Sequence, residues 1–116
     1  MGFWIHITAS SDVSLNVMGS IPTTTNIVLH TDVGGWNLVG YPSAKNNDPL
    51  PAALVDHGVG TDFSLVFAYH AYDTADLWKI FDRLAPAWSN DLTVLSPGWG
   101  YWVKVSADHT WHVEYP

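Results

Sequence analysis

Histidine is the residue type in this chain that most readily binds metal ions, and six are present. His109 and His112 are three residues apart on a predicted strand, so they point to opposite faces and share an ion only if the backbone bulges. No His-Glu-x-x-His motif occurs. We therefore interpret these two, and the four scattered along the rest of the chain, as surface or rim residues: His6, His30, His57 and His70.

Oxygen-bearing side chains cluster in three places and raise the possibility of calcium. The clusters are Asn46-Asn47-Asp48, the pair Asp73 and Asp76, and the pair Asn90 and Asp91. Calcium takes about six to eight oxygen ligands, and no EF-hand spacing is present. Loop polarity and helix capping explain most of these residues, so we expect no cofactor, with calcium as a weak alternative.

No catalytic motif stands out in the sequence. Glycosidases use two carboxylates across a cleft, but eleven acidic residues always offer pairs. No Gly-x-Ser-x-Gly motif supports a serine nucleophile, and the absence of cysteine excludes disulfides, cysteine-ligated zinc and thiol catalysis. Gly34-Gly35 and Gly58-Val59-Gly60 lack the context of a phosphate-binding loop. We therefore expect a protein that is not an enzyme.

Sugar binding has better support, because seven tryptophans are present and exposed aromatic rings stack on pyranose faces. Trp88 and Trp99 lie in or beside predicted loops. Nearby carboxylates and amides can bind hydroxyl groups. The alternative is that these rings close the end of a β-sandwich. The candidate ligand-binding residues are Trp88, Trp99, Asp73, Asp76, Asn90 and Asp91.

Composition limits the class of protein and of partner. At 116 residues the chain has the size of one domain, and 47% of its residues are hydrophobic. The net charge of −7 argues against nucleic acid and anionic lipid as partners. No apolar run is long enough for a membrane span, and no signal peptide is visible after Met1.

Alternating apolar residues predict an all-β protein. The clearest strand follows the turn Ser96-Pro97-Gly98 and places Tyr101, Val103 and Val105 on one face, with Trp102, Lys104 and Ser106 on the other. About eight short strands at this spacing indicate an antiparallel β-sandwich or a partly closed barrel. One short helix is predicted near 48–58, with Asp48 as its cap, Pro49 in its first turn and Gly58 just after its end.

Several residues are expected to be structural. Pro97 fixes its own φ in the turn, and Gly98 and Gly100 can take a positive φ or leave room for a neighbouring ring. The strongest strands are expected to bury Trp36, Leu38, Leu65, Phe67, Tyr101, Val103 and Val105, while Trp102 lies on the opposite face.

The chain begins and ends with a similar pattern. Residues 1–18 predict a hairpin, and moving it forward by 98 positions places Gly2 on Gly100, Trp4 on Trp102 and the other apolar residues on apolar residues through 116. This match suggests a tandem repeat. The N-terminal hairpin is expected either to pack on its own module or to dock on a neighbouring chain. We favour the first because consecutive elements usually lie together.

Two motifs carry a family resemblance. Residues 35–43 read Gly-Trp-Asn-Leu-Val-Gly-Tyr-Pro-Ser, and residues 95–103 read Leu-Ser-Pro-Gly-Trp-Gly-Tyr-Trp-Val. Together they resemble a repeat module of large archaeal and bacterial cell-surface and secreted proteins, over most of residues 23–116. The resemblance implies an extracellular location, tandem neighbours and no catalytic residues. At His70-Ala71-Tyr72-Asp73 the chain departs from the simpler Tyr-Asp step of that pattern.

These observations favour a noncatalytic structural or adhesive module of a cell-surface or secreted protein. Its expected partners are neighbouring repeats of the same chain, identical subunits or glycans. The alternatives are a carbohydrate-binding module that uses exposed Trp and Tyr, a self-associating filament or surface-layer subunit, and an accessory domain of an enzyme.

Overall fold

A four-stranded antiparallel sheet is the largest element of the fold. The computed structural model describes residues 4–116, and in it the strand predicted most clearly occupies the middle of this sheet. The order across the sheet is β2-β7-β4-β5, formed by β2 (Trp36–Gly40), β7 (Gly100–Val105), β4 (Phe63–Tyr69) and β5 (Trp78–Asp82).

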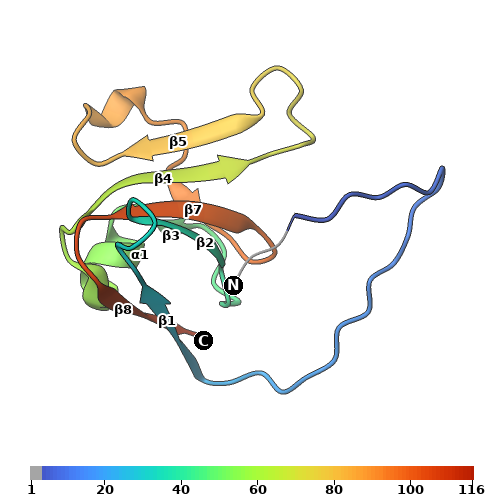
Figure 1. Ribbon diagram of the computed structural model, residues 1–116, viewed down its shortest axis with the longest axis horizontal. Coiled ribbons are helices and arrows are strands. Elements are labelled where there is room, and N and C mark those ends of the chain that lie inside the picture. The colour runs from blue at the N-terminus through green and yellow to red at the C-terminus, as the bar shows by residue number, and fades with distance from the viewer. Residues whose placement is uncertain (1–3) are drawn as a thin grey trace.

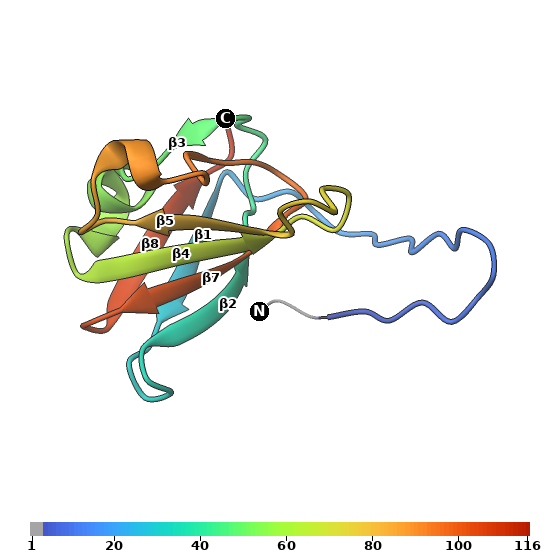
Figure 2. The ribbon, with the colours of Figure 1, turned by 90° about the horizontal axis from the view of Figure 1, so that it is seen from above.

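Two smaller sheets lie against one side of the large one (Figures 1 and 2). In the first, β1 (Thr24–Leu29) pairs antiparallel with β8 (His109–Glu114). In the second, the two-residue strands β3 (Asp48–Pro49) and β6 (Val94–Leu95) pair with each other. Within residues 4–116 the sheets do not close into a barrel, so the predicted all-β, sandwich-like fold is confirmed.

The single helix begins later than predicted. Asp48 and Pro49 are paired with β6, so α1 starts at Ala52 and runs only to Leu54 before a wider turn over Val55–Val59. Gly58 lies inside this turn with φ of +101°. A Cβ at Gly58 would lie 2.5 Å from the carbonyl oxygen of Thr110, so the turn packs closely on β8. No helix among residues 4–116 is long and apolar enough to cross a membrane.

Trp111 on β8 lies at the centre of the core. Its side chain is completely buried, and its indole Nε1 donates a 2.7 Å hydrogen bond to the carbonyl oxygen of Ala53. Its ring stacks on Tyr41 with 6.0 Å between centroids. Burying a tryptophan with its N–H paired both fills volume and leaves no polar group unsatisfied. The other large core residues are Leu29, Leu54, Val59, Phe63, Val66, Leu95, Tyr101 and Val103.

The predicted core is correct for β7 and wrong for β2 and β4. Tyr101, Val103 and Val105 are buried as expected, and Trp102 faces the other way. On β2 and β4 the core-facing residues are instead Val39, Val66 and Ala68. The residues expected in the core lie half-buried on the outer face: Trp36, Leu38, Leu65 and Phe67.

A β-bulge accounts for part of this error. The pairing of β4 with β7 shifts between Phe63 and Leu65, so the alternation changes phase there. Phe63 therefore joins Val66 and Ala68 on the core side. Both faces of β4 are apolar, so alternation alone could not show which one is covered.

The hairpin predicted over residues 1–18 does not form within residues 4–18, and residues 1–3 lie outside the part of the chain that the structure describes. Residues 4–22, which we call the N-terminal segment, contain no strand and extend away from the sheets (Figures 1 and 2). Its apolar side chains are exposed, and only Trp4 stacks on rings of the domain. The matching C-terminal residues, 100–116, do not form a hairpin either. A short turn joins β7 to β8, but the two strands belong to different sheets. The preferred arrangement, a hairpin packed on its own module, is therefore wrong.

Candidate functional site: an aromatic face on the large sheet

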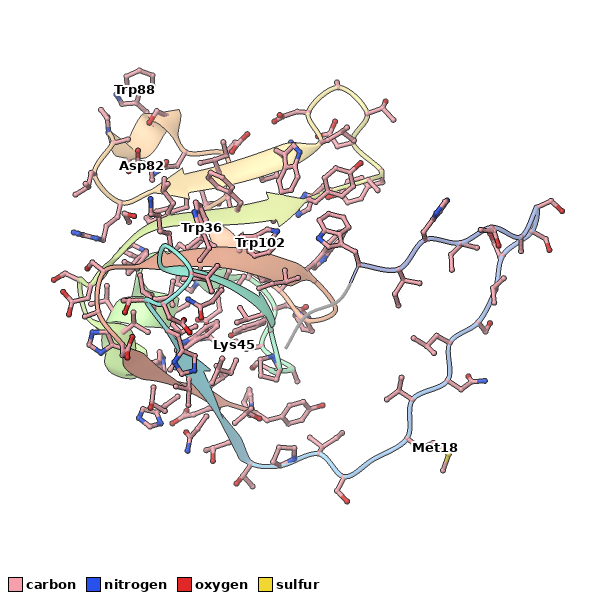
Figure 3. The ribbon with its side chains drawn as sticks, in the orientation of Figure 1. Met18, Trp36, Lys45, Asp82, Trp88 and Trp102 are labelled. Atoms are coloured by element: carbon pink, nitrogen blue, oxygen red, sulfur yellow. The ribbon has the colours of Figure 1, made fainter. Side chains whose placement is uncertain are left out.

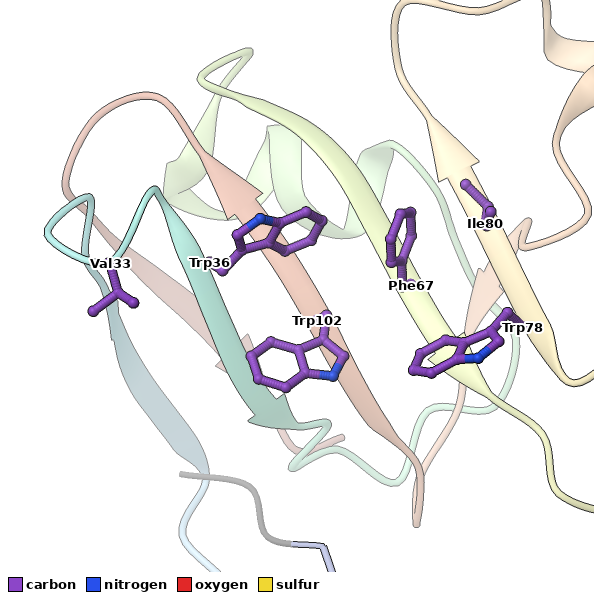
Figure 4. A pocket seen from close by; sticks show the side chains of 6 residues that line it. All are labelled: Val33, Trp36, Phe67, Trp78, Ile80 and Trp102. Carbon is purple, nitrogen blue, oxygen red and sulfur yellow. The ribbon is translucent and has the colours of Figure 1, made fainter.

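The outer face of the four-stranded sheet is apolar across its whole width. In the antiparallel register Leu38 lies opposite Trp102, and Phe67 lies opposite both Trp102 and Ile80, so one apolar row crosses all four strands. An open groove of about 690 Å³ lies over this face. We call the residues that line it the aromatic face (Figure 4): Val33, Trp36, Phe67, Trp78, Ile80 and Trp102.

The rings of the aromatic face support one another. Phe67 is 5.2 Å from Trp36 and 6.4 Å from Trp78, measured between ring centroids. Edge and tilted contacts at such distances stabilise a ring cluster beyond the area it buries. Nothing among residues 4–116 covers the cluster, so Trp78 remains 41% exposed and Ile80 39% exposed. The rings are therefore positioned by the sheet while remaining open to solvent.

Trp4 extends this surface at one end. Its ring lies 5.4 Å from Tyr69 and 6.3 Å from Trp78. Beside it, Gly40 pairs with Gly100, and because neither has a side chain the sheet leaves a hollow there. A cavity of about 140 Å³ at this hollow is lined by Trp4, Leu38, Tyr69, Gly100 and Trp102. A Cβ built on Gly100 would meet only the carbonyl oxygen of Val39, at 3.8 Å, so no ring packs directly on this glycine, whereas Gly98 has a positive φ of +81°.

Charged groups lie at one end of the outer face only. Lys104 pairs with Trp36 on one side and Leu65 on the other, and its Nζ lies 5.5 Å from the centre of the Trp36 ring. Asp82 lies opposite Leu65 on β5. The groove itself contains no acid, base or nucleophile among its lining residues. Such a surface can bind a partner through apolar contact and ring stacking.

The two tryptophans predicted to bind sugar do not share a site. Trp88 lies on the 3-10 turn Ala87–Ser89, beyond the C-terminal end of β5, and is 87% exposed (Figure 3). Trp99 packs on the loop at the other end of β5, with its ring 4.5 Å from His70 and 5.6 Å from Tyr72. Neither lines the groove on the aromatic face.

Asn90 and Asp91 protect the edge of the sheet. The backbone N–H of Ile80 donates to Asp91 Oδ1 at 2.7 Å, and that of Asp82 donates to Asn90 Oδ1 at 2.9 Å. The N–H of Leu92 donates to the carbonyl oxygen of Ile80. These contacts satisfy Ile80 and Asp82 on the free side of β5, where they would otherwise be open for pairing. Both side chains therefore have a structural role that explains their presence.

Asp73 and Asp76 bind a lysine. Lys79 Nζ lies 2.7 Å from Asp73 Oδ2 and 2.9 Å from Asp76 Oδ2. Hydrogen bonds from Lys79 lower the pKa of both carboxyls. Within residues 4–116 no group of three or more His, Cys, Asp or Glu is arranged to hold a metal ion. His109 and His112 have separate partners, Asp62 and Asn26.

The sequence does not predict the aromatic face. It predicts Trp36 and Phe67 in the core and Trp102 on the face opposite the core, and it gives Val33, Trp78 and Ile80 no ligand-binding role. One signal was present: strands with apolar residues on both faces in a chain this short have more apolar surface than one core can cover.

No protein-family model, curated protein or solved structure matches this chain. The resemblance to surface-repeat modules therefore remains a prediction.

Proposed function

We propose that this chain is a noncatalytic adhesive module of a cell-surface or secreted protein. The aromatic face is the observation that supports this function. Three tryptophans, a phenylalanine and two aliphatic residues line an open groove on a rigid sheet. Contiguous exposed apolar surface of this kind usually marks an interaction site. The side chains need no rearrangement to be reached, because the sheet already holds them in place.

Carbohydrate binding is the second candidate, and it uses the same face. The rings of Trp36 and Trp102 lie over neighbouring strands, and Trp78 lies beyond Phe67 in the same direction (Figure 4). A row of rings on a sheet can stack successive sugar units. The apolar lining of the groove favours a protein partner instead, since a sugar also requires hydrogen bonds to its hydroxyl groups.

The test compares two single tryptophan variants. Trp102→Ala removes the central ring of the groove, whereas Trp88→Ala removes an exposed ring that lies outside it. Each purified protein is applied to insoluble glucan, chitin and xylan, and to beads carrying immobilised wild-type chain. We expect wild type and Trp88→Ala to be retained on at least one of these materials and Trp102→Ala to be lost from it.

Each outcome discriminates between the candidates. Retention on a polysaccharide favours carbohydrate binding, and retention on the chain alone favours a protein partner. Failure of wild type to bind any material, or equal retention of Trp102→Ala, contradicts the use of the aromatic face.

A further inference from the structure

The two edge strands of the large sheet, β5 and β2, differ in how their outward-pointing backbone groups are hydrogen-bonded. On the free side of β5, the backbone groups of Ile80 and Asp82 are bonded to Asn90, Asp91 and Leu92. At the other edge, two hydrogen bonds at the ends of the β2–β7 pairing show which residues point toward β7. Val105 N donates to Gly35 O, and Tyr41 N donates to Trp99 O. Antiparallel strands alternate the direction of their hydrogen bonds. The N–H and C=O groups of Leu38 and Gly40 therefore point away from β7.

No donor or acceptor among residues 4–116 is bonded to these groups of Leu38 and Gly40. Gly40 is exposed, and a Cβ built on it would meet nothing within 4 Å. With respect to residues 4–116, the edge of β2 is thus open to another strand. An open edge is a template for pairing, and proteins usually block it as β5 does here. The difference between the two edges indicates that β2 has a partner.

The N-terminal segment has the residue pattern of a strand that could pair with such an edge. In the N-terminal segment Ile5 and Ile7 alternate with His6 and Thr8, which is the pattern of a half-buried strand. The offset of 98 residues places Ile5 and Ile7 on Val103 and Val105, and both of those side chains are buried in the core. The segment therefore has the apolar pattern of a core strand but no strand partner.

Charge also favours the N-terminal segment as the partner. Only Asp12 of the eleven acidic residues lies in it, and it carries no lysine or arginine. The rest of the chain has ten acids against four bases, which is a net charge of −6. In two copies of the chain these negatively charged parts repel each other, whereas a nearly uncharged strand can approach either of them.

We propose that residues 4–9 of a second copy of this chain add to β2 as a fifth antiparallel or parallel strand. Alternation then fixes the faces of the donated strand. With Trp4 on the outer side, where it already stacks on Tyr69 and Trp78 in its own chain, Ile5 and Ile7 lie on the core side. The added strand thus lengthens the aromatic face and covers two exposed isoleucines.

The occupant is a second copy because residues 4–22 of the same chain do not pair with this edge: from Trp4 onward they lead away from the sheets before the chain returns to β1 (Figures 1 and 2). Donor strand and acceptor edge are different surfaces, so the contact is head to tail. Repetition of such a contact gives linear assemblies or rings. Strand addition uses the backbone of β2 and does not depend on the ligand of the aromatic face.

The test measures the mass of the full chain by sedimentation velocity over a wide range of concentration. Gly40→Pro removes the edge N–H, and Ile7→Asp places a charge on the core side of the donor. Gly19→Pro and Val17→Asp make the same changes outside residues 4–9 and outside β2. We expect the mass of wild type and of both controls to rise with concentration, and the two edge and donor variants to stay monomeric.

A mixture of the two monomeric variants gives the sharpest result. Gly40→Pro keeps an intact donor and Ile7→Asp keeps an intact acceptor, so together they should form a dimer that grows no further. In wild type, the amides of Leu38 and Gly40 should gain protection from hydrogen exchange as concentration rises. This measurement needs no variant, so it stands even if Gly40→Pro fails to fold.

Three results would overturn the proposal. The first is a wild type that stays monomeric with unprotected amides at every concentration. The second is association that Gly40→Pro leaves unchanged. The third is a monomeric wild type in which the amides of Leu38 and Gly40 are protected at every concentration, because the segment would then occupy β2 of its own chain. Loss of polysaccharide retention in Trp102→Ala, with association intact, separates this inference from the proposed function.

Discussion

At the scale of single residues, one buried carboxylate connects two parts of the fold. Asp48 on β3 accepts a 2.6 Å hydrogen bond from the Tyr41 hydroxyl, and its other oxygen lies 2.6 Å from Lys45 Nζ. Burial alone raises the pKa of Asp48, but the hydrogen bonds from Lys45 and Tyr41 outweigh it and lower the pKa below its usual value. Burial and the Asp48 carboxylate raise the pKa of Tyr41.

This arrangement predicts a dependence of stability on pH. A carboxyl with a lowered folded-state pKa stabilises the fold above its unfolded pKa of about 3.9, and loses that contribution as pH falls through the folded pKa. Asp48→Asn should lower the free energy of unfolding by about 2 kcal/mol at neutral pH and flatten the fall in acid. Urea unfolding at a series of pH values measures both effects. Asp12→Asn, in the exposed N-terminal segment, should match wild type.

A substitution at Gly35 that adds only a methyl group is expected to lower the free energy of unfolding more than Asp48→Asn does. Its φ is +80°, and a Cβ would overlap the carbonyl oxygen of Val105, which is its partner at the start of the β2–β7 ladder. Gly35→Ala should lower the free energy of unfolding by more than about 3 kcal/mol, because strain and overlap add. Gly34→Ala is the matched control, since Gly34 also has a positive φ but faces open space. Equal losses in thermal unfolding would refute the overlap.

At the scale of elements, strands were more predictable than the faces they bury. The sequence predicts strands at 23–31, 36–41, 62–70, 77–81 and 110–115, which overlap β1, β2, β4, β5 and β8, and the strand predicted after Gly98 is β7. β-Branched residues indicate the first of these, and alternation indicates the clearest of the others because pleating gives side chains a period of two. Alternation could not orient β2, where Trp36 and Leu38 alternate with Asn37 and Val39. Asn37 tolerates its inward position because its amide bonds the backbone of His30 and Gly35. Both partners lie within seven residues of Asn37, in the turn that leads into β2, and the alternation of apolar residues gives no information about such bonds.

Two tryptophan substitutions compare how much the core and the aromatic face contribute to the free energy of unfolding. Trp111→Ala leaves a cavity in the core and an unpaired carbonyl at Ala53, and should lower the free energy of unfolding by about 3–5 kcal/mol. Trp102→Ala removes a half-buried ring from the open aromatic face and should cost about half as much. Chemical denaturation of both variants makes the comparison. A larger loss for Trp102→Ala would mean that the outer face is covered in solution.

At the scale of the whole molecule, the sheets and the core require only residues from about 23 onward. The first hydrogen bond of this part joins Tyr115 N to Thr23 O, and the N-terminal segment contributes no residue to the core. The predicted hairpin of residues 1–18 could pair only with itself, and an isolated two-stranded hairpin buries too little apolar surface to offset its loss of entropy. This explains why no strand forms in residues 4–18, although their pattern matches β7 and β8.

Limited proteolysis should reveal this division. Thermolysin cleaves before exposed apolar residues, and the N-terminal segment offers Ile5, Ile7, Val13, Leu15 and Val17, whereas most apolar residues of the sheets are paired and buried. In dilute solution we expect rapid cleavage there, and mass spectrometry should find a resistant product that begins between residues 13 and 23. Trypsin is the control, because the first lysine is Lys45 and no basic residue precedes it.

The same thermolysin experiment can be repeated at increasing protein concentration. If copies associate through residues 4–9, cleavage before Ile5 and Ile7 should slow as the protein is concentrated, while cleavage before Val13 to Val17 should not. A donated strand has its backbone bonded to β2, and a protease needs that backbone extended and free. Uniform slowing at all five sites would instead indicate that the whole segment is buried. Unchanged cleavage at every concentration would show that the segment has no strand partner.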